Sequence, residues 1–258
     1  MTRPSISKDM GILVLDRTQY DDAYHLQKTL QIKRIADEIP DILIVTEHDP
    51  VVTLGSSADW DHLLRTDEDY ELLGIEIFTT DRGGGVTYHG PGQIVLYPIF
   101  KLEAEERDLH LYLRKLEAIV LKLLAQYQIP ATVYPGITGV FVGNRKIAQI
   151  GIRVKEWVTM HGLSFNIYPN LNHFRTIVPC GLSQYEVGSM AGELGYRPEW
   201  EKIVSQLLQS FELSFNRSPV LLDQSWLNNR CDYGEQFFRI KSPTLLPKIT
   251  PSSSSLPS

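Results

Sequence analysis

Apolar and polar residues alternate in several short runs along the chain, and these runs predict β-strands. The runs are rich in β-branched residues and end at turn formers or charges. In the first half of the chain the predicted strands cover residues 11–15, 41–46, 51–54, 75–79 and 94–99. Farther on, residues 133–167 predict a meander with strands at 139–142, 146–154 and 159–167 and a hairpin turn at Gly143-Asn144.

Three other segments repeat apolar side chains at helical spacing. Residues 20–39 carry one apolar face and stop at Pro40, which cannot continue a helix. Residues 108–129 predict a helix that Asp108 caps at its N-terminus. The third helix begins with a proline near its first turn and carries three apolar positions: Pro198, Ile203, Leu207 and Leu208.

This irregular mixture of strands and helices predicts an α+β fold of two layers, a mixed β-sheet packed by helices, rather than a regular βαβ array. The chain has 258 residues, of which 43% are hydrophobic, and this is enough for one large core. Residues 1–240 are predicted to form a single catalytic domain. The proline- and serine-rich residues 241–258 are predicted to be a disordered tail. No motif follows residue 215, and we interpret the remainder as a dispensable extension.

The charge and the cysteine count exclude several classes of protein. A formal net charge of -6 provides no basic field for nucleic acid, so no nucleic-acid partner is expected. No apolar stretch is long enough to span a bilayer and the N-terminus lacks a signal-peptide core, so we expect a cytoplasmic protein without a membrane partner. Two cysteines without zinc-type spacing predict neither a disulfide framework nor a metal site, and no cofactor is expected.

The most informative segment is Arg-Gly-Gly-Gly-Val-Thr-Tyr-His-Gly-Pro-Gly-Gln at 82–93. Glycines let a ligand lie against backbone amides, although a tight hairpin between strands is the plainer interpretation. The spacings of known phosphate-binding loops are not met, and a strand rather than a helix follows. The segment therefore predicts a loop between strands that presents amides, Arg82 and His89 to a ligand.

Three other residues have two open interpretations from the sequence alone. Cys180, between Pro179 and Gly181, is either a nucleophile held on a loop or a small buried hydrophobe. Lys146, at the start of an apolar strand, is either the cation that would lower a thiol pKa or an ordinary hairpin charge. His161 is either a base or a hydrogen-bonded core residue. The second cysteine, Cys231, is interpreted as buried.

Four motifs occur in an order and at intervals that closely resemble the octanoyltransferases of lipoate biosynthesis. They lie at 82–93, 146–153, 157–162 and 178–181, and residues 47–55 match an earlier motif of that family. The resemblance covers roughly residues 11–215. It implies the catalytic fold of the lipoate- and biotin-protein ligases. It also implies transfer of an octanoyl group from octanoyl-acyl carrier protein to a lysine ε-amine, the first step of protein lipoylation. The acceptors would be lipoyl domains of 2-oxoacid dehydrogenases and the glycine cleavage H protein.

The resemblance also implies roles for individual residues. Cys180 would carry the acyl group as a thioester, and Lys146 would lower the thiol pKa and move protons. Val86, Tyr88 and Leu163 are expected to wall a slot for the eight-carbon chain. The residues implied in substrate binding are Arg82, Gly83, Gly84, Gly85, Val86, Thr87, Tyr88, His89, Gln149, Ile150, Gly151, Gly162, Leu163 and Ser164.

Alternatives stay open beside this assignment. An ATP-dependent lipoate- or biotin-protein ligase would share the fold, an octanoyl amidotransferase between lipoyl domains is a closer relative, and a non-catalytic carrier-binding protein is a third possibility. One departure from the family pattern is Gly188, where the family usually has threonine. Because both protein partners are typically acidic, a basic docking face is expected from Arg82, Arg145, Lys146, Arg153, Lys155 and Arg175.

Overall fold

A computed structural model describes residues 8–181, 184–231 and 238–241 of the chain, apart from the side chains of residues 8 and 180. Within these residues, one large mixed sheet contains nine strands. They are Lys8–Val14 (β1), Asp41–Thr46 (β2), Gln93–Ile99 (β6), Ala131–Tyr134 (β7), Ile137–Val142 (β8), Arg145–Lys155 (β9), Val158–Asn166 (β10), Glu186–Val187 (β11) and Arg217–Leu221 (β12).

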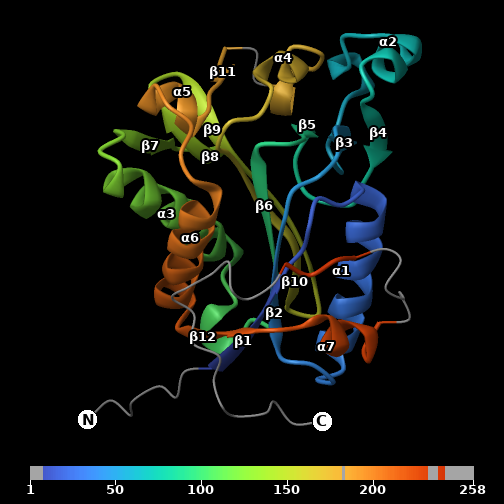
Figure 1. The fold of residues 1–258 in the computed structure, drawn as a ribbon, viewed down its shortest axis with the longest axis vertical. Helices are drawn as coiled ribbons and strands as arrows, with labels where there is room; N and C mark the ends of the chain where they lie inside the picture. The colour runs from blue at the N-terminus through green and yellow to red at the C-terminus, as the bar shows by residue number, and fades with distance from the viewer. Residues whose placement is uncertain (1–7, 182–183, 232–237, 242–258) are drawn as a thin grey trace.

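The large sheet combines parallel and antiparallel pairs, which confirms the predicted α+β class (Figure 1). Its order is β12-β1-β2-β6-β10-β9-β8-β7, and β11 pairs with β9 outside this path. Strand β1 runs parallel to both β2 and β12, and β11 runs parallel to β9. The other pairs are antiparallel, so the second half of the sheet is the meander that the sequence predicts.

A small second sheet stands beside the large one, in the order β4-β3-β5. Its strands are Val51–Leu54 (β3), Glu76–Thr79 (β4) and Val86–His89 (β5). Two short helices, Asp67–Leu72 (α2) and Leu171–Phe174 (α4), contribute Tyr70 and Phe174 to the apolar cluster beneath it.

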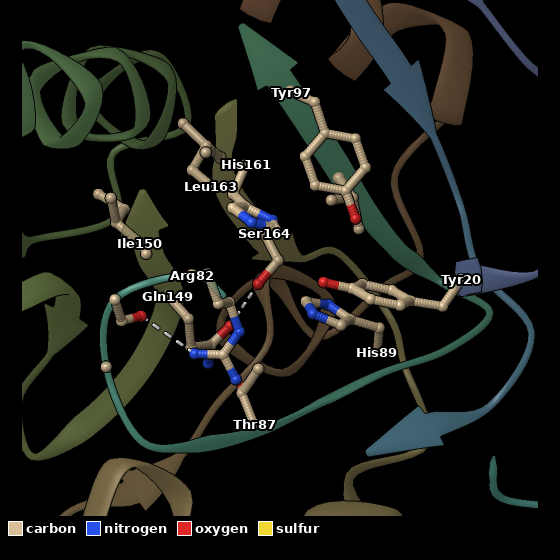
Figure 2. Close-up of a pocket in the computed structure, with 15 residues that line it drawn as sticks. Tyr20, Arg82, Thr87, His89, Tyr97, Gln149, Ile150, His161, Leu163 and Ser164 are labelled. Atoms are coloured by element: carbon tan, nitrogen blue, oxygen red, sulfur yellow. Dashed lines mark hydrogen bonds between the residues drawn. The ribbon is translucent and has the colours of Figure 1, made fainter. Parts of the chain in front are cut away.

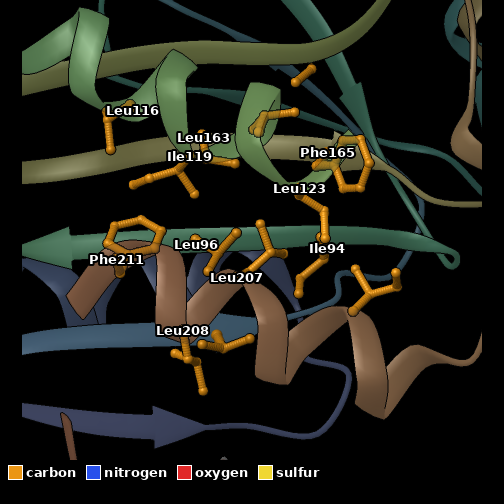
Figure 3. Close-up of a cluster of buried hydrophobic side chains, with 14 of the residues drawn as sticks. Ile94, Leu96, Leu116, Ile119, Leu123, Leu163, Phe165, Leu207, Leu208 and Phe211 are labelled. Atoms are coloured by element: carbon orange, nitrogen blue, oxygen red, sulfur yellow. The ribbon is translucent and has the colours of Figure 1, made fainter. Parts of the chain in front are cut away.

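Helices cover both faces of the large sheet, so the fold has three layers rather than the two that the sequence predicts. Leu109–Gln126 (α3) and Trp200–Phe215 (α6) pack on one face, and Tyr20–Ile35 (α1) packs on the other with Gln224–Asn228 (α7). Alternate residues of β6 are apolar on both faces of the sheet, so each face needs a cover. Ile94 and Leu96 join the cluster with α3 and α6 (Figure 3), whereas Val95 and Tyr97 join the cluster with α1. The remaining short elements are Met190–Leu194 (α5), Trp60–His62 (η1), Ala104–Glu106 (η2) and Pro179–Gly181 (η3).

The helix ends differ from the predicted ones for local backbone reasons. Helix α1 starts at residue 20 as predicted but ends at Ile35, because Asp37 has a φ of 59° and leaves the helical path before Pro40. The predicted cap of α3 is confirmed, since the Asp108 carboxylate accepts a hydrogen bond of 3.0 Å from the Leu111 amide. Helix α6 begins two residues after Pro198 and runs on to Phe215.

The sequence predicted a loop along the whole glycine-rich segment, residues 82–93, and this is only partly right. Its centre, Val86–His89, is strand β5, and it pairs antiparallel with β3. Two β-branched residues and a tyrosine between two groups of glycines are enough to form this strand once β3 offers a partner edge. The loop character remains at Arg82–Gly85 and again after His89.

The interpretation of the chain after residue 215 as a dispensable extension is wrong for its first part. Strand β12 pairs in parallel with β1, and the side chain of Arg217 is 1% exposed. Its Nε donates to Asp41 Oδ2 at 2.6 Å and its Nη1 donates to Glu106 Oε1 at 2.9 Å. This buried ion pair ties β12 to β2 and to the turn before α3.

The domain boundary at residue 240 and the disorder of the tail stay predictions. Of residues 241–258 only Lys241 is described, with its amide donating to the carbonyl of Val14 at 2.7 Å, and residues 242–258 lie outside the described residues. In the described part of the chain, no helix combines the length and the apolar character that crossing a bilayer requires.

We expect Arg217→Ala to lower the free energy of unfolding by about 3–5 kcal/mol, because it removes a buried ion-pair partner of both Asp41 and Glu106 and leaves Asp41 with Arg34 alone among its ion-pair partners in the described residues. Urea denaturation measures this, with Arg17→Ala as the control. Arg17 pairs with Asp49 at the surface, so its loss should cost less than about 1 kcal/mol. Equal effects of the two substitutions would contradict a stabilising role for β12.

Candidate active site

A narrow cavity lies where the glycine loop of the small sheet meets β9 and β10 of the large sheet (Figure 2). It holds about 440 Å³ of space outside the protein atoms, part of it open to solvent. The lining residues are Tyr20, Arg82, Gly83, Gly84, Thr87, His89, Val95, Tyr97, Gln149, Ile150, Gly151, His161, Gly162, Leu163 and Ser164.

The glycine loop lies directly on the backbone of β9. The Gly83 amide donates to the carbonyl of Ile152 at 2.9 Å. A Cβ on Gly151 would lie 2.6 Å from the Gly83 carbonyl oxygen, closer than any side chain allows. Glycine at residue 151 is therefore required by this close approach of two backbones.

The buried side chain of Arg82 fixes the glycine loop by hydrogen bonds to backbone carbonyls. Its side chain is 7% exposed, and its Nη2 donates to the carbonyls of Thr53 at 2.7 Å and Gly85 at 2.8 Å. The guanidinium thus ties the glycine loop to β3. Arg82 lines the cavity as predicted, but its donors are engaged with the protein backbone.

The structure separates the predicted binding residues of β5 onto two faces. Thr87 and His89 line the cavity, whereas Val86 and Tyr88 lie in the core under the small sheet. The expectation that Val86 and Tyr88 wall the slot is therefore wrong. Leu163 does line it, and the predicted residue Gly85 stays outside the lining.

Three cavity residues escaped the sequence analysis: Tyr20 comes from α1, and Val95 and Tyr97 come from β6. Each looks like an ordinary core residue in the sequence, and only the packing of distant elements brings them together. His161 of β10, which the sequence left open as a base or a core residue, lines the cavity as well. Val95, Ile150 and Leu163 give the cavity its apolar walls.

Three polar atoms on lining residues are buried without a hydrogen-bond partner among the described residues. They are Thr87 Oγ1, Gln149 Nε2 and His161 Nδ1. The other end of the Gln149 amide accepts a hydrogen bond of 3.0 Å from Ser164 Oγ. An unpaired buried polar group costs about 1–3 kcal/mol, so each of these atoms favours a ligand with a complementary polar group.

A relay of hydrogen bonds fixes the tautomer of His89. Asn166 Nδ2 donates to the carbonyl of Gly188 at 2.9 Å, and Gln93 Nε2 donates to Asn166 Oδ1 at 2.8 Å. Gln93 Oε1 is then the acceptor toward His89 Nδ1, at 2.6 Å. His89 Nδ1 therefore carries the proton, and its Nε2 presents a lone pair.

Gly188, the departure from the family pattern, contributes to this relay through its backbone. Its carbonyl accepts from Asn166, and its amide donates to the Lys146 carbonyl at 2.9 Å. A Cβ at residue 188 would lie 3.0 Å from Arg145 Cβ, whose guanidinium forms a two-fold hydrogen bond with Glu193. The contact between β11 and β9 therefore needs no hydroxyl at this position.

A second buried histidine, His48, forms a hydrogen bond with Tyr97, a residue that lines the cavity. Its Nδ1 donates to the carbonyl of Thr18 at 3.0 Å, so its Nε2 accepts from the Tyr97 hydroxyl at 2.7 Å. Burial lowers the pKa of His48 to about 4. Burial and the neighbouring His48 also lower the pKa of His89 well below its usual value. Both rings are therefore neutral at pH 7.

His161 is a hydrogen-bonded buried residue that also lines the cavity. Its φ of 60° is unusual for a residue with a side chain, and its Nε2 lies 2.8 Å from Asp81 Oδ1. Burial lowers the pKa of His161 despite this contact. Burial would raise the pKa of Asp81, but the hydrogen bond and charge of His161, with Arg153 alongside, bring it down to about 2.

Lys146 is buried rather than an ordinary hairpin charge. Its side chain is 5% exposed, and its Nζ lies 5.6 Å from the centre of the Phe141 ring. Gly139 has a φ of 134°, and a Cβ there would lie 2.5 Å from Lys146 Cε. On α3, Glu117 accepts a hydrogen bond of 2.9 Å from the Gly139 amide. Burial raises the pKa of Glu117, whereas the positive charge of Lys146 opposes this rise.

Cys180 lies in the short turn η3, which packs against β5. The turn is anchored by the Val178 amide, which donates to the carbonyl of His62 at 2.8 Å. Seven residues after the cysteine, Val187 pairs with Lys146 in the β11–β9 ladder. The Cys180 side chain lies outside the described residues, so its distance from Lys146 stays a prediction. Cys231 is 3% exposed, as its interpretation as a buried residue requires.

The expected basic docking face does not form as predicted. Arg82 and Lys146 are buried, and Arg145 and Arg153 pair with Glu193 and Asp81. Lys155 and Arg175 are the two members of the expected set that are exposed without a salt bridge among the described residues. In the same residues, no group of three or more histidine, cysteine, aspartate or glutamate side chains could hold a metal ion.

The buried neutral state of His48 predicts a pH dependence of stability. Between pH 6.5 and about 4 the unfolded chain binds a proton on this ring and the folded chain does not, so acidification through this window destabilises the fold. We expect the free energy of unfolding of the wild type to fall by roughly 2–3 kcal/mol more than that of His48→Gln over this window. Urea titrations at several pH values measure the difference. The control is His110→Gln, at an exposed position of α3, and a His48→Gln protein with the wild-type pH profile would contradict the assignment.

Solved structures share this fold. The bipartite lipoate protein ligase of Thermoplasma acidophilum aligns with a TM-score of 0.65 at 14% identity, over 86% of this chain and 90% of that chain. A lipoate-protein ligase A bound with ATP aligns with a TM-score of 0.63 at 12% identity, over 86% of this chain and 92% of that chain. At this identity the likeness concerns the fold alone, and it confirms the predicted ligase-like architecture.

Sequence relatives identify the family. Residues 19–212 match the model of the lipoyl protein ligase A/B catalytic domain. The octanoyltransferase of Caldicellulosiruptor saccharolyticus is 41% identical over 204 residues, which are 78% of this chain and 87% of that protein. The octanoyltransferase of Gloeobacter violaceus is 47% identical over 172 residues, 66% of this chain and 75% of that protein. The chain therefore belongs to the octanoyltransferase family and carries the lipoyl protein ligase A/B catalytic domain.

Proposed function

We propose that this octanoyltransferase carries the acyl group as a thioester on Cys180, with Lys146 as its proton donor and acceptor. The donor is octanoyl-acyl carrier protein, and the acceptor is a lysine on a lipoyl domain or on the glycine cleavage H protein. The observation that supports this proposal best is the arrangement along β9, where a buried lysine at residue 146 precedes the residues at 149–151 that line a glycine-walled cavity.

The cavity suits a saturated acyl chain. Val95, Ile150 and Leu163 offer apolar walls, and each buried methylene contributes about 0.8 kcal/mol. The unpaired Gln149 Nε2 can donate to the acyl carbonyl, where negative charge develops during thioester exchange. The neutral His89 adds no charge to the cavity, and the guanidinium of Arg82 is held by the carbonyls of Thr53 and Gly85.

Lys146 suits the proton transfers. Its ammonium lies in a buried slot between Phe141, Gly139 and the Glu117 side of α3, where solvent does not screen its charge. A cation beside a thiol favours the thiolate, which is the nucleophilic form. Strand β11 returns from the cysteine turn and pairs with the Lys146 backbone, which supports the approach of the two residues.

The transfer then has two steps. The Cys180 thiolate attacks the octanoyl thioester, and the pantetheine thiolate leaves with a proton from the Lys146 ammonium. In the second step the lysine amine of the acceptor attacks the new thioester, its proton passes to the Lys146 amine, and the Cys180 thiolate leaves. No nucleotide is consumed, in contrast to an ATP-dependent ligase. Because the nucleophile must stay reduced, we place the enzyme in the cytoplasm.

Incubation with octanoyl-acyl carrier protein and no ATP should add one octanoyl group to the protein. Intact-mass analysis should find this adduct removed by hydroxylamine and absent in Cys180→Ala, while Cys231→Ala retains it because that residue is buried elsewhere. An adduct that persists in Cys180→Ala, or modification of a lipoyl domain that requires octanoate and ATP, would contradict the transfer through Cys180.

The rate of alkylation by iodoacetamide, followed against pH, should show a midpoint below about 8.5 in the wild type. Lys146→Met removes the charge and should raise the midpoint by at least about 1 pH unit. Gly139→Ala should also raise it, because its Cβ would displace the lysine stem. Lys155→Met, at an exposed position of β9, serves as the control. An unchanged midpoint in Lys146→Met would refute its role toward the thiol.

A further inference from the structure

A second cavity, next to the cysteine turn, is separate from the proposed acyl cavity. It holds about 770 Å³ of space outside the protein atoms, part of it open to solvent. Phe174, Pro179 and Val187 give it an apolar side, and Arg175, Tyr185 and Glu186 add polar groups. None of these residues lines the acyl cavity.

This cavity touches neighbours of both proposed catalytic residues. Pro179 directly precedes Cys180 in η3, and Val187 pairs with Lys146 across the β11–β9 ladder. Farther along β9, Gln149 to Gly151 line the acyl cavity, and at about 3.3 Å per strand residue this is roughly 10 Å from Lys146. Along β9, the backbone of Lys146 therefore lies next to a residue of the second cavity and about three residues from the first. If Cys180 and Lys146 meet as proposed, a thioester whose acyl chain occupies the first cavity would direct its sulfur side toward the second.

The charges in the second cavity favour an anion at Arg175. This arginine is exposed at the end of α4, and no ion pair of the described residues involves it. The hydrogen bond and charge of Glu193, with a smaller contribution from Glu186, raise the pKa of Arg145, so Glu186 lies near a second guanidinium as well. A guanidinium binds phosphate oxygens through charge-assisted hydrogen bonds.

We propose that the second cavity binds the 4′-phosphopantetheine arm of the acyl donor, with Arg175 facing the phosphate. The inference rests on the proposed function, since it takes the donor to be a pantetheine thioester. The apolar side formed by Phe174, Pro179 and Val187 faces the branched, uncharged part of the arm. Arg175 therefore contributes to recognition of the donor and takes no part in the chemical steps.

The acceptor lysine has to reach the same thioester in the second step, so it is the alternative occupant of this cavity. A lysine side chain carries no phosphate, and Arg175 would repel its ammonium. The effect of the phosphate on the first step alone thus distinguishes the two occupants.

The test compares two small donors that differ only in the phosphate, S-octanoyl-4′-phosphopantetheine and S-octanoylpantetheine. Single-turnover acylation of Cys180 is followed by intact-mass analysis. Because both donors are small molecules, no contact with the carrier protein contributes to the rate. We expect Arg175→Ala to lower kcat/KM for the phosphorylated donor about tenfold and to leave the unphosphorylated donor unchanged. Arg175→Lys should restore part of the loss.

Arg65→Ala is the matched control, because Arg65 is exposed on a segment whose neighbour Leu64 bonds to Thr176, yet it does not line the cavity. Arg65→Ala should leave kcat/KM unchanged for both donors. An equal loss for both donors in Arg175→Ala would assign Arg175 a structural role, and no loss for either would place the phosphate elsewhere. Both results overturn the inference. Failure of the proposed function looks different, because then neither small donor nor octanoyl-acyl carrier protein labels Cys180 in the wild type.

Discussion

The contact between two stretches of backbone, the glycine loop and strand β9, is the constraint on which the acyl cavity depends. The Gly83 amide bonds to the Ile152 carbonyl, and the space between them admits no Cβ at residue 151. Arg82 keeps the loop there, because its buried guanidinium donates to the carbonyls of Thr53 and Gly85 and to the Thr53 hydroxyl. The result is a narrow slot bounded by two hydrogen-bonded stretches of backbone, and a preorganised slot orders a flexible chain at low entropic cost to the protein.

Buried polar groups around this slot are kept neutral rather than charged. His48 and His89 each donate from Nδ1 to a fixed acceptor, and burial keeps both rings unprotonated. The relay behind His89 ends at the carbonyl of Gly188, one residue beyond the pair of Val187 with Lys146. The geometry of the acyl cavity is thereby coupled to the strand that follows the cysteine turn. This coupling uses backbone atoms of residue 188, so it requires no side chain at that position.

The buried charges are divided between stability and chemistry. Arg217 is surrounded by Asp41 and Glu106 and joins three parts of the large sheet and its connections, so its role is structural. Lys146 instead occupies a slot formed by a left-handed glycine and an aromatic ring, with Glu117 engaged by the Gly139 amide. A cation held this way is suited to stabilise a thiolate and to exchange protons with either substrate.

The sequence by itself determined the class of fold, most strands to within a few residues, the cap of α3 and the family, because these follow from local periodicity and from motifs read along the chain. It also singled out Lys146 and Cys180 and most of the cavity lining. Only the tertiary structure decided that Val86 and Tyr88 face the core, since their orientation depends on which face of β5 meets the large sheet. It likewise decided that Arg82 is engaged by backbone, that β12 completes the sheet, and that Tyr20 and Tyr97 reach the cavity. These features arise from contacts between residues far apart in the chain, which no local pattern encodes.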